Sequence, residues 1–218
     1  MVTQLGLRKE TTRSAKTERW LEGERLIIRR MVRGDLEQMQ RWRPFREPLS
    51  LTWNLYWESK AQMDHWLERR SQDPSYRMYT ITLRDGRVIG RLSLRHIRPG
   101  ESAVLGISLG ADWVGQGYGT EAITVFAPYY FDVLGFRVLW LDVAATNQRA
   151  IRCYEKCGFV HAGSRYQPVD SGEDLSFLQK PEYAHLRQFF TRKWGRYWLL
   201  FHDMKLERDD LNGQEKAW

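Results

Sequence analysis

The 218-residue chain has little cysteine and no long apolar run. Its two cysteines, Cys153 and Cys157, lie four positions apart with no histidine pattern nearby, so neither a disulfide framework nor a Cys/His zinc site is expected. No stretch approaches the roughly 20 apolar residues of a membrane-spanning helix, and no secretory leader is recognisable at the N-terminus. The sequence therefore predicts a cytoplasmic protein with no metal and no membrane partner.

Two common phosphate-binding loops are also missing. Residues 114–123 read V-G-Q-G-Y-G-T-E-A-I, and no Lys-Ser/Thr pair follows the glycines, which excludes the loop that holds a nucleoside triphosphate. The glycines fall as G-x-G-x-G and not as the G-x-G-x-x-G of a dinucleotide-binding fold.

What this segment does have is a glycine turn followed by a helix-compatible run. Glycine lets successive N–H groups turn toward one point, and a helix start adds unpaired donors and the positive end of its dipole. The segment predicts a phosphate cradle of a third kind, with a purely geometric turn as the alternative.

Charge is distributed unevenly along the chain. The formal net charge is +7, and the first 33 residues hold nine basic against four acidic side chains, a net +5. Such a segment is typical of a solvated extension, and contact with RNA, as on a ribosome, is the alternative. The ten tryptophans are scattered without a basic–aromatic repeat, so nucleic-acid binding is not expected as the main function.

A second informative stretch follows the glycine turn. Residues 138–143 read as a strand, and the residues after it read as a helix that Asn147 caps and Gly158 ends. Asn147 and Tyr154 then share one helix face, about 10.5 Å apart along the axis. This face suits a thin, extended ligand, and the alternative is an amphipathic helix with a core-facing tyrosine.

Together the two stretches resemble the GNAT superfamily of N-acetyltransferases, whose loop reads Q/R-x-x-G-x-G/A and whose helix reads N-x-x-A-x-x-x-Y-E-K-x-G-F. The second pattern is complete between Asn147 and Phe159. The first has Gly117 and Gly119 in place, but Val114 stands where Gln or Arg is usual. This departure removes a side-chain contact and leaves the backbone cradle.

The resemblance covers about residues 25–163 and a last strand near 196–204. Residues 105–113 are most similar to the branch that acetylates the N-termini of ribosomal proteins. The resemblance implies an α/β (α+β) fold with a mixed, mostly antiparallel sheet, flanked by helices and splayed at an acetyl-CoA site. It also implies acetyl-CoA as co-substrate and a primary amine as acceptor.

The resemblance further assigns site residues. The expected acetyl-CoA contacts are Ile107, Leu109, Val114, Gly115, Gln116, Gly117, Tyr118, Gly119, Thr120 and Asn147. Tyr154 is the expected catalytic acid, because a phenol with a pKa near 10 is protonated at neutral pH and can donate to the leaving thiolate.

The hydrophobic pattern predicts one domain at residues 24–207, between a basic extension at 1–23 and a tail at 208–218. Strands are expected at residues 26–31, 76–83, 88–97, 103–109 and 138–143, and helices at 35–42, 59–70 and 147–157. An insert at about 164–195 contains a predicted helix at 181–194, which Gly195 would end. We expect the insert to serve packing or a homodimer contact, with an active-site lid as the alternative.

The general base is not evident. The family often places a glutamate before the loop in the pattern A-E-L-G, but residues 103–106 read A-V-L-G. His96, Glu101 and Ser108 are candidate helpers. A protein α-amine titrates near 7.7–8.0, against about 10.4 for lysine, so it needs less help to become nucleophilic. The preferred acceptor is therefore a protein N-terminal α-amine.

Two alternatives stay open. A small amine such as a polyamine or an aminoglycoside would require carboxylates, and residues 170–174 are the only concentrated acidic stretch nearby. The other alternative is a non-catalytic module that binds acetyl-CoA or a protein partner.

Overall fold

The computed structural model describes residues 20–54, 57–170 and 173–209. Its strands are β1 (Leu21–Glu22), β2 (Leu26–Arg30), β3 (Arg77–Leu83), β4 (Val88–Arg98), β5 (Ser102–Leu109), β6 (Val138–Ala144), β7 (Val160–Pro168), β8 (Phe190–Lys193) and β9 (Arg196–Glu207). Its α-helices are α1 (Arg33–Met39), α2 (Lys60–Gln72), α3 (Tyr118–Pro128) and α4 (Gln148–Lys156). Shorter helical turns are η1 (Pro48–Trp53), η2 (Ala111–Trp113), η3 (Tyr129–Val133), η4 (Ser176–Gln179) and η5 (Pro181–Phe189).

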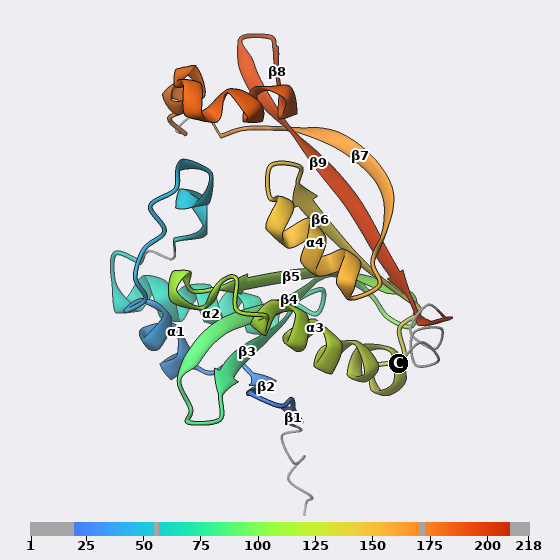
Figure 1. Cartoon of the computed structure of the whole chain (residues 1–218). Coiled ribbons are helices and arrows are strands. Elements are labelled where there is room, and N and C mark those ends of the chain that lie inside the picture. The colour runs from blue at the N-terminus through green and yellow to red at the C-terminus, as the bar shows by residue number, and fades with distance from the viewer. Residues whose placement is uncertain (1–19, 55–56, 171–172, 210–218) are drawn as a thin grey trace, which may run out of the picture.

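The strands form one sheet with helices on both faces (Figure 1). The strand order is β1-β2-β3-β4-β5-β6-β9-β7, and β8 also pairs with β9. All neighbours are antiparallel except β5 and β6. The predicted fold class is therefore confirmed.

The two faces of the sheet carry separate apolar clusters. On β3, Tyr79 and Ile81 pack into the main core with Phe126 of α3, whereas Thr80 between them points to the opposite face and donates to Asp35 of α1 at 2.7 Å. This alternation is the period of two expected of a strand. The second cluster, on the side of α1 and α2, is built on Leu36, Met39, Trp57, Met63 and Val88.

The sheet opens between β5 and β6. Their parallel pairing ends at Val104 and Trp140, after which β5 stays with β4 while β6 continues along β9. The predicted splayed strand pair is thus present, and its opening lies beside the glycine turn that follows β5.

The predicted helix at residues 181–194 is wrong in its second half. The 3₁₀ helix η5 ends at Phe189, and β8 follows and pairs with β9. Trp194 and Gly195 both have positive φ angles, +50° and +76°, which is the geometry of a tight hairpin turn. Gly195 therefore marks a strand reversal and not a helix end.

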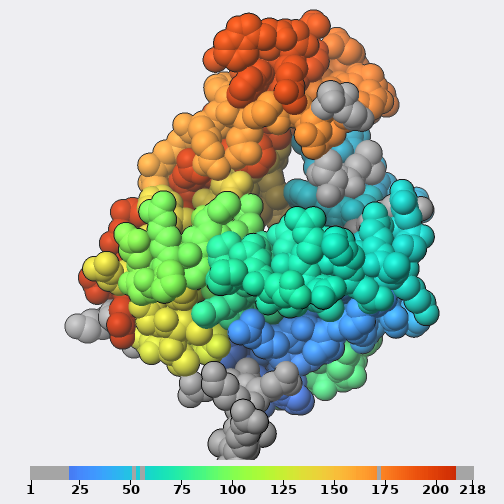
Figure 2. All heavy atoms as spheres, turned by 180° about the vertical axis from the view of Figure 1, so that it is seen from behind, coloured from blue at the N-terminus to red at the C-terminus, as the bar shows by residue number. Residues whose placement is uncertain are grey.

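The insert, β7 and β9 form an arch that rises from the rest of the sheet (Figure 1). Seen from behind, a hollow lies between this orange arch and the cyan segment around η1 (Figure 2). The arch and η1 are far apart in sequence, and the hollow between them is lined by both.

The domain boundaries stay predictions, since residues 1–19 and 210–218 lie outside the described part of the chain. Leu21 and Glu22, within the predicted extension, pair with β2 and so belong to the sheet. In the three described ranges, no helix is both long and apolar enough to cross a membrane.

Candidate active site

The glycine turn leads from η2 into α3. Gly115 and Gly117 have φ angles of +79° and +84°, where a residue without a Cβ meets no steric penalty. Gly117 is the N-cap of α3, and its carbonyl accepts the N–H of Glu121 at 3.0 Å. The first N–H groups of α3 have no partner within the helix and lie at the positive end of its dipole. The local geometry fits a phosphate cradle.

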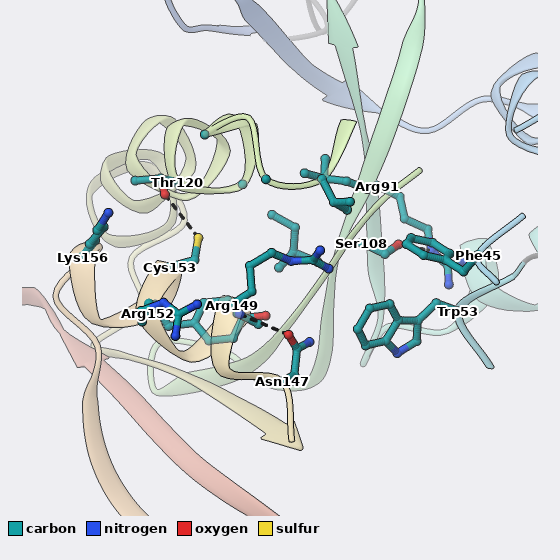
Figure 3. A pocket seen from close by; sticks show the side chains of 18 residues that line it. Phe45, Trp53, Arg91, Ser108, Thr120, Asn147, Arg149, Arg152, Cys153 and Lys156 are labelled. Atoms are coloured by element: carbon teal, nitrogen blue, oxygen red, sulfur yellow. Dashed lines mark hydrogen bonds between the residues drawn. The ribbon is translucent and has the colours of Figure 1, made fainter. Parts of the chain in front are cut away.

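A cavity of about 400 Å³ extends from this turn past β5 toward η1. The predicted site residues that line it are Ile107, Leu109, Val114, Gly115, Gly117, Gly119, Thr120, Asn147 and Tyr154. Figure 3 shows Thr120 and Lys156 toward one end and Phe45 and Trp53 toward the other. Gln116 and Tyr118 do not line the cavity and instead contact Arg25.

Strand β5 presents backbone groups to this cavity. Gly110 donates its N–H to Ile89 at 3.0 Å. Because backbone groups of alternate residues point to the same side of a strand, those of Ser108 face β4. Those of Ile107 and Leu109 face the opening left by β6. An extended ligand arm in the opening could hydrogen-bond to both residues.

Four cations line the same cavity and were not among the predicted site residues: Arg91, Arg149, Arg152 and Lys156. Three of them come from α4, where the sequence pattern placed them off the face of Asn147 and Tyr154. The sequence shows that these three cations lie on one predicted helix, but it does not show that the packing of α4 beside α3 brings them to the glycine turn. We call this space the basic cavity.

Helix α4 supplies two predicted residues. The side-chain carbonyl of Asn147 accepts the N–H of Ala150 at 3.2 Å, which confirms the predicted cap and leaves the amide NH₂ for another partner. Tyr154, two turns later, is half-buried. Burial raises the pKa of Tyr154 far above its usual value, and the neighbouring Cys153 and Asp142 add to the shift. The phenol therefore stays protonated near neutral pH.

The two cysteines lie on the α3 side of α4. Cys153 lines the basic cavity and its sulfur lies 3.3 Å from Thr120 Oγ1, whereas Cys157 is buried. Hydrogen bonding from Cys157 lowers the pKa of the Cys153 thiol, and Thr120 and Lys156 contribute to the same shift. Both cysteines are free, as predicted.

A second cavity, of about 680 Å³, meets the basic cavity at Tyr154. The residues that line both cavities are Trp53, Ile107, Asn147, Arg149 and Tyr154. Four carboxylates line the second cavity, from Glu47, Asp142, Asp170 and Glu173. We call it the acidic cavity. Its walls come from η1, β6, β7, β9 and the insert.

The four carboxylates differ in their partners. Asp142 accepts a hydrogen bond from Arg95 at 2.8 Å and lies 3.9 Å from Arg165, which is also paired with Asp203. Glu173 has no ion pair of this kind with any described residue. Burial raises the pKa of Glu173, and the negative charge of Asp170 raises it further. Within the described ranges, the carboxylate of Glu173 is therefore not neutralised by a paired cation.

The predicted helpers for proton removal are not brought together. Ser108 lines the basic cavity and accepts a hydrogen bond from Arg91 at 3.1 Å. His96 and Glu101 line neither cavity. The structure therefore gives no support to either as a general base. Among the residues described, no cluster of three or more His, Cys, Asp or Glu side chains is placed to hold a metal ion.

Comparisons with known proteins agree on the family. A model described as an acetyltransferase (GNAT) domain matches residues 25–160. Spermidine N(1)-acetyltransferase of Vibrio cholerae is 27% identical over 154 residues, which cover 66% of this chain and 89% of that protein. The probable N-acetyltransferase YjcK of Bacillus subtilis is 30% identical over 106 residues, which cover 48% of this chain and 59% of that protein.

Solved structures show the same fold. Spermidine N-acetyltransferase from Vibrio cholerae in complex with CoA and spermine has a TM-score of 0.63 and 22% identity, covering 85% of this chain and 97% of that one. The relative with a named substrate thus lies in a different branch from the ribosomal-protein acetyltransferases that residues 105–113 resemble. The superfamily prediction is confirmed, and the branch prediction receives no support. The chain belongs to the GNAT family of acetyltransferases and is an N-acetyltransferase that uses acetyl-CoA.

Proposed function

We propose that this enzyme acetylates a primary amine of a small polycation such as a polyamine. The observation that carries the proposal is the division of charge between the two cavities. The basic cavity suits the phosphates of acetyl-CoA, and the acidic cavity suits an acceptor with more than one positive charge. Both cavities reach Tyr154, where the two substrates would meet.

On the co-substrate side, we assign the pyrophosphate to the N–H groups of the glycine turn and of the first turn of α3. Arg149, Arg152 and Lys156 supply positive charge along the same cavity. The backbone groups of Ile107 and Leu109 would hold the extended arm. When bound, acetyl-CoA supplies the acetyl thioester.

Tyr154 is our proposed general acid. Tyr154 is one of the residues that line both cavities, and the raised pKa of its phenol keeps the proton in place. A protonated group beside a leaving thiolate can deliver the proton that the thiolate needs. The amide NH₂ of Asn147, two turns earlier at the start of α4, would hold the arm in register with this hydroxyl.

The division of charge also helps the acceptor to lose its proton. A cation near an ammonium lowers the ammonium pKa, and a carboxylate raises it. Arg91 and Arg149 therefore favour the neutral amine on the basic side, while Asp170 and Glu173 hold a distal ammonium in its charged form. A polycation would thus orient with its reacting amine toward Tyr154, without a glutamate on β5.

Aromatic side chains complement these charges. Trp53 and Tyr183 line the acidic cavity, and aromatic faces attract ammonium groups and cover methylene chains. Spermidine, the substrate named for the Vibrio cholerae relative, combines ammonium groups with methylene chains. These observations favour a small polyamine over the protein N-terminal α-amine predicted from the sequence.

The test is a direct competition between acceptor classes. We expect spermidine to be acetylated with a kcat/KM at least about tenfold above that of a peptide with a free N-terminus, because only the polyamine has a second charge for the acidic cavity. Mass spectrometry of the products gives both rates in one mixture. Faster acetylation of the peptide would contradict the proposal and favour a protein N-terminal α-amine as the acceptor.

A further inference from the structure

Arg25, in the turn between β1 and β2, makes an unusual set of contacts with the glycine turn. Its Nη1 donates to the carbonyl of Gln116 at 3.0 Å, and its guanidinium carbon lies 4.4 Å from the centre of the Tyr118 ring. A Cβ built on Gly117, between these two residues, would lie 3.2 Å from Arg25 Nη2. One guanidinium thus covers three consecutive residues of the turn.

The same arginine is anchored to α3. Its main-chain N–H and its Nε donate to the two carboxylate oxygens of Glu121, both at 2.7 Å. Burial acts to raise the pKa of Glu121, but these hydrogen bonds from Arg25 lower it overall, which keeps the carboxylate charged. The positive charge of Arg25 is balanced by Glu121, so its effect on a nearby phosphate is mainly geometric.

The geometric effect follows from the planarity of the peptide bond. In a trans peptide the C=O and the following N–H point in opposite directions. Because Arg25 holds the Gln116 carbonyl on its own side, the N–H of Gly117 points to the other side of the turn, where the basic cavity lies. A hydrogen bond to the carbonyl also polarises the amide and makes its N–H a better donor.

We infer that Arg25 is a positioning residue for acetyl-CoA, which acts by fixing the glycine turn with its N–H groups aimed at the pyrophosphate. Two residues of the turn have left-handed φ angles, and glycine adopts these no more readily than many others. An outside clamp is therefore needed to hold one conformation. This inference rests on the proposed assignment of the turn to the pyrophosphate.

The test replaces Arg25 with methionine, which keeps the side-chain length and removes the guanidinium. We expect the Kd for CoA, measured by calorimetry without acceptor, to rise about tenfold, and the KM for acetyl-CoA to rise equally while kcat at saturation changes less than about twofold. S-acetyl-pantetheine lacks the pyrophosphate, so its KM should not change. The Kd for CoA in Arg25→Lys should lie between the wild-type value and that of Arg25→Met. A lysine ammonium can pair with Glu121, but it covers less of the glycine turn than a guanidinium does.

The matched control is Arg84→Met. Arg84 also binds the β1–β2 turn, through the carbonyls of Glu24 at 2.8 Å and Gly23 at 2.5 Å, but it has no contact with the glycine turn. Its loss should leave the Kd for CoA within about twofold. An unchanged Kd in Arg25→Met, or an equal rise in the KM for S-acetyl-pantetheine, would overturn the inference. Absence of CoA binding by the wild-type protein would instead refute the site assignment itself.

Discussion

The basic and acidic cavities are built in different ways. The basic cavity comes mostly from one continuous part of the chain, between Ile107 and Lys156, with Phe45, Trp53 and Arg91 added at its far end. The acidic cavity combines segments around Glu47, Asp142, Asp170, Tyr183 and Phe201. The residues that match the family pattern thus lie in a local motif, whereas the residues that line the proposed acceptor site come from segments that only the fold brings together.

The largest effect that can test this division is expected at the junction. Tyr154→Phe should lower kcat by about 10²–10⁴-fold, because it removes the hydroxyl that we propose as the general acid for the thiolate. The affinity for CoA should change little, since the ring still packs against Phe159. Initial-rate assays at saturating substrates give kcat, and calorimetry gives the Kd for CoA, so the two effects are measured separately.

The matched control for this prediction is Tyr166→Phe, an exposed tyrosine on β7 that lines neither cavity. It should retain the wild-type kcat. If Tyr154→Phe also retains the wild-type kcat in an assay limited by chemistry, Tyr154 is a packing residue and another group is the general acid.

A smaller effect should be confined to the basic cavity. Gly119→Val is expected to weaken CoA binding by about one to two orders of magnitude, because the new side chain enters the cavity near Cys153 Sγ, 3.5 Å from the Cβ position. Gly117→Val should do the same, with added backbone strain from its φ of +84°. Calorimetry with CoA measures the loss.

Gly34→Val is the control, since a Cβ on Gly34 would meet nothing within 4 Å. It should keep the Kd for CoA. The KM for the acceptor in Gly119→Val, extrapolated to saturating acetyl-CoA, should stay close to wild type. A loss of acceptor binding equal to the loss of CoA binding would mean that the two cavities are not separable.

The contrast also explains what the sequence could predict. The glycine turn, the Asn147 cap and the position of Tyr154 depend on neighbours within a few residues, so a pattern reveals them. The local pattern around Asp142 predicts only a strand, and the place of Asp142 in the acidic cavity depends on how β6 separates from β5. Glu47 carried no local signal at all.

The insert shows the same limit in the secondary structure. Residues 181–194 have helical spacing, yet β9 offers a free edge on which residues 190–193 form β8. Pairing with β9 therefore determines the structure of residues 190–193, despite their helical spacing. The sequence shows the acidic stretch at residues 170–174, but only the fold decides which of its carboxylates line the acidic cavity. Asp170 and Glu173 line it, whereas Asp174 accepts the N–H of Ser176 at 2.8 Å.

The next effect in size, below that of the glycine variants, is expected from the acidic cavity. The double change Asp170→Asn and Glu173→Gln should raise the KM for spermidine about tenfold and leave the KM for acetyl-CoA unchanged, because it removes the charges that we propose to hold a distal ammonium. Asp174→Asn, next in sequence but outside the cavity, should have no effect on either KM. An unchanged KM in the double variant would exclude this cavity as the acceptor site.

The pH dependence sharpens the same prediction. The pKa of Glu173 is raised by burial and by Asp170, so Glu173 gains its negative charge later than an ordinary glutamate as pH rises. The KM for spermidine should therefore fall as pH rises through this pKa. The fall should be reduced in Glu173→Gln and retained in Asp174→Asn. Steady-state kinetics over the acidic range, with stability checked at each pH, measure it.

The smallest expected effect is a difference in thiol reactivity along the basic cavity. Cys153 lines the cavity with a lowered pKa, whereas Cys157 is buried with a raised one. Because the thiolate is the reactive form, iodoacetamide should alkylate Cys153 several-fold faster than Cys157 near neutral pH. CoA should slow the reaction at Cys153, and spermidine alone should not, because the polyamine is expected in the other cavity. Peptide mass spectrometry gives both rates from one sample, and Cys153→Ser should remove the rapid phase. Equal protection by spermidine would show that the acceptor extends into the basic cavity, against the separation of charge on which the proposed function rests.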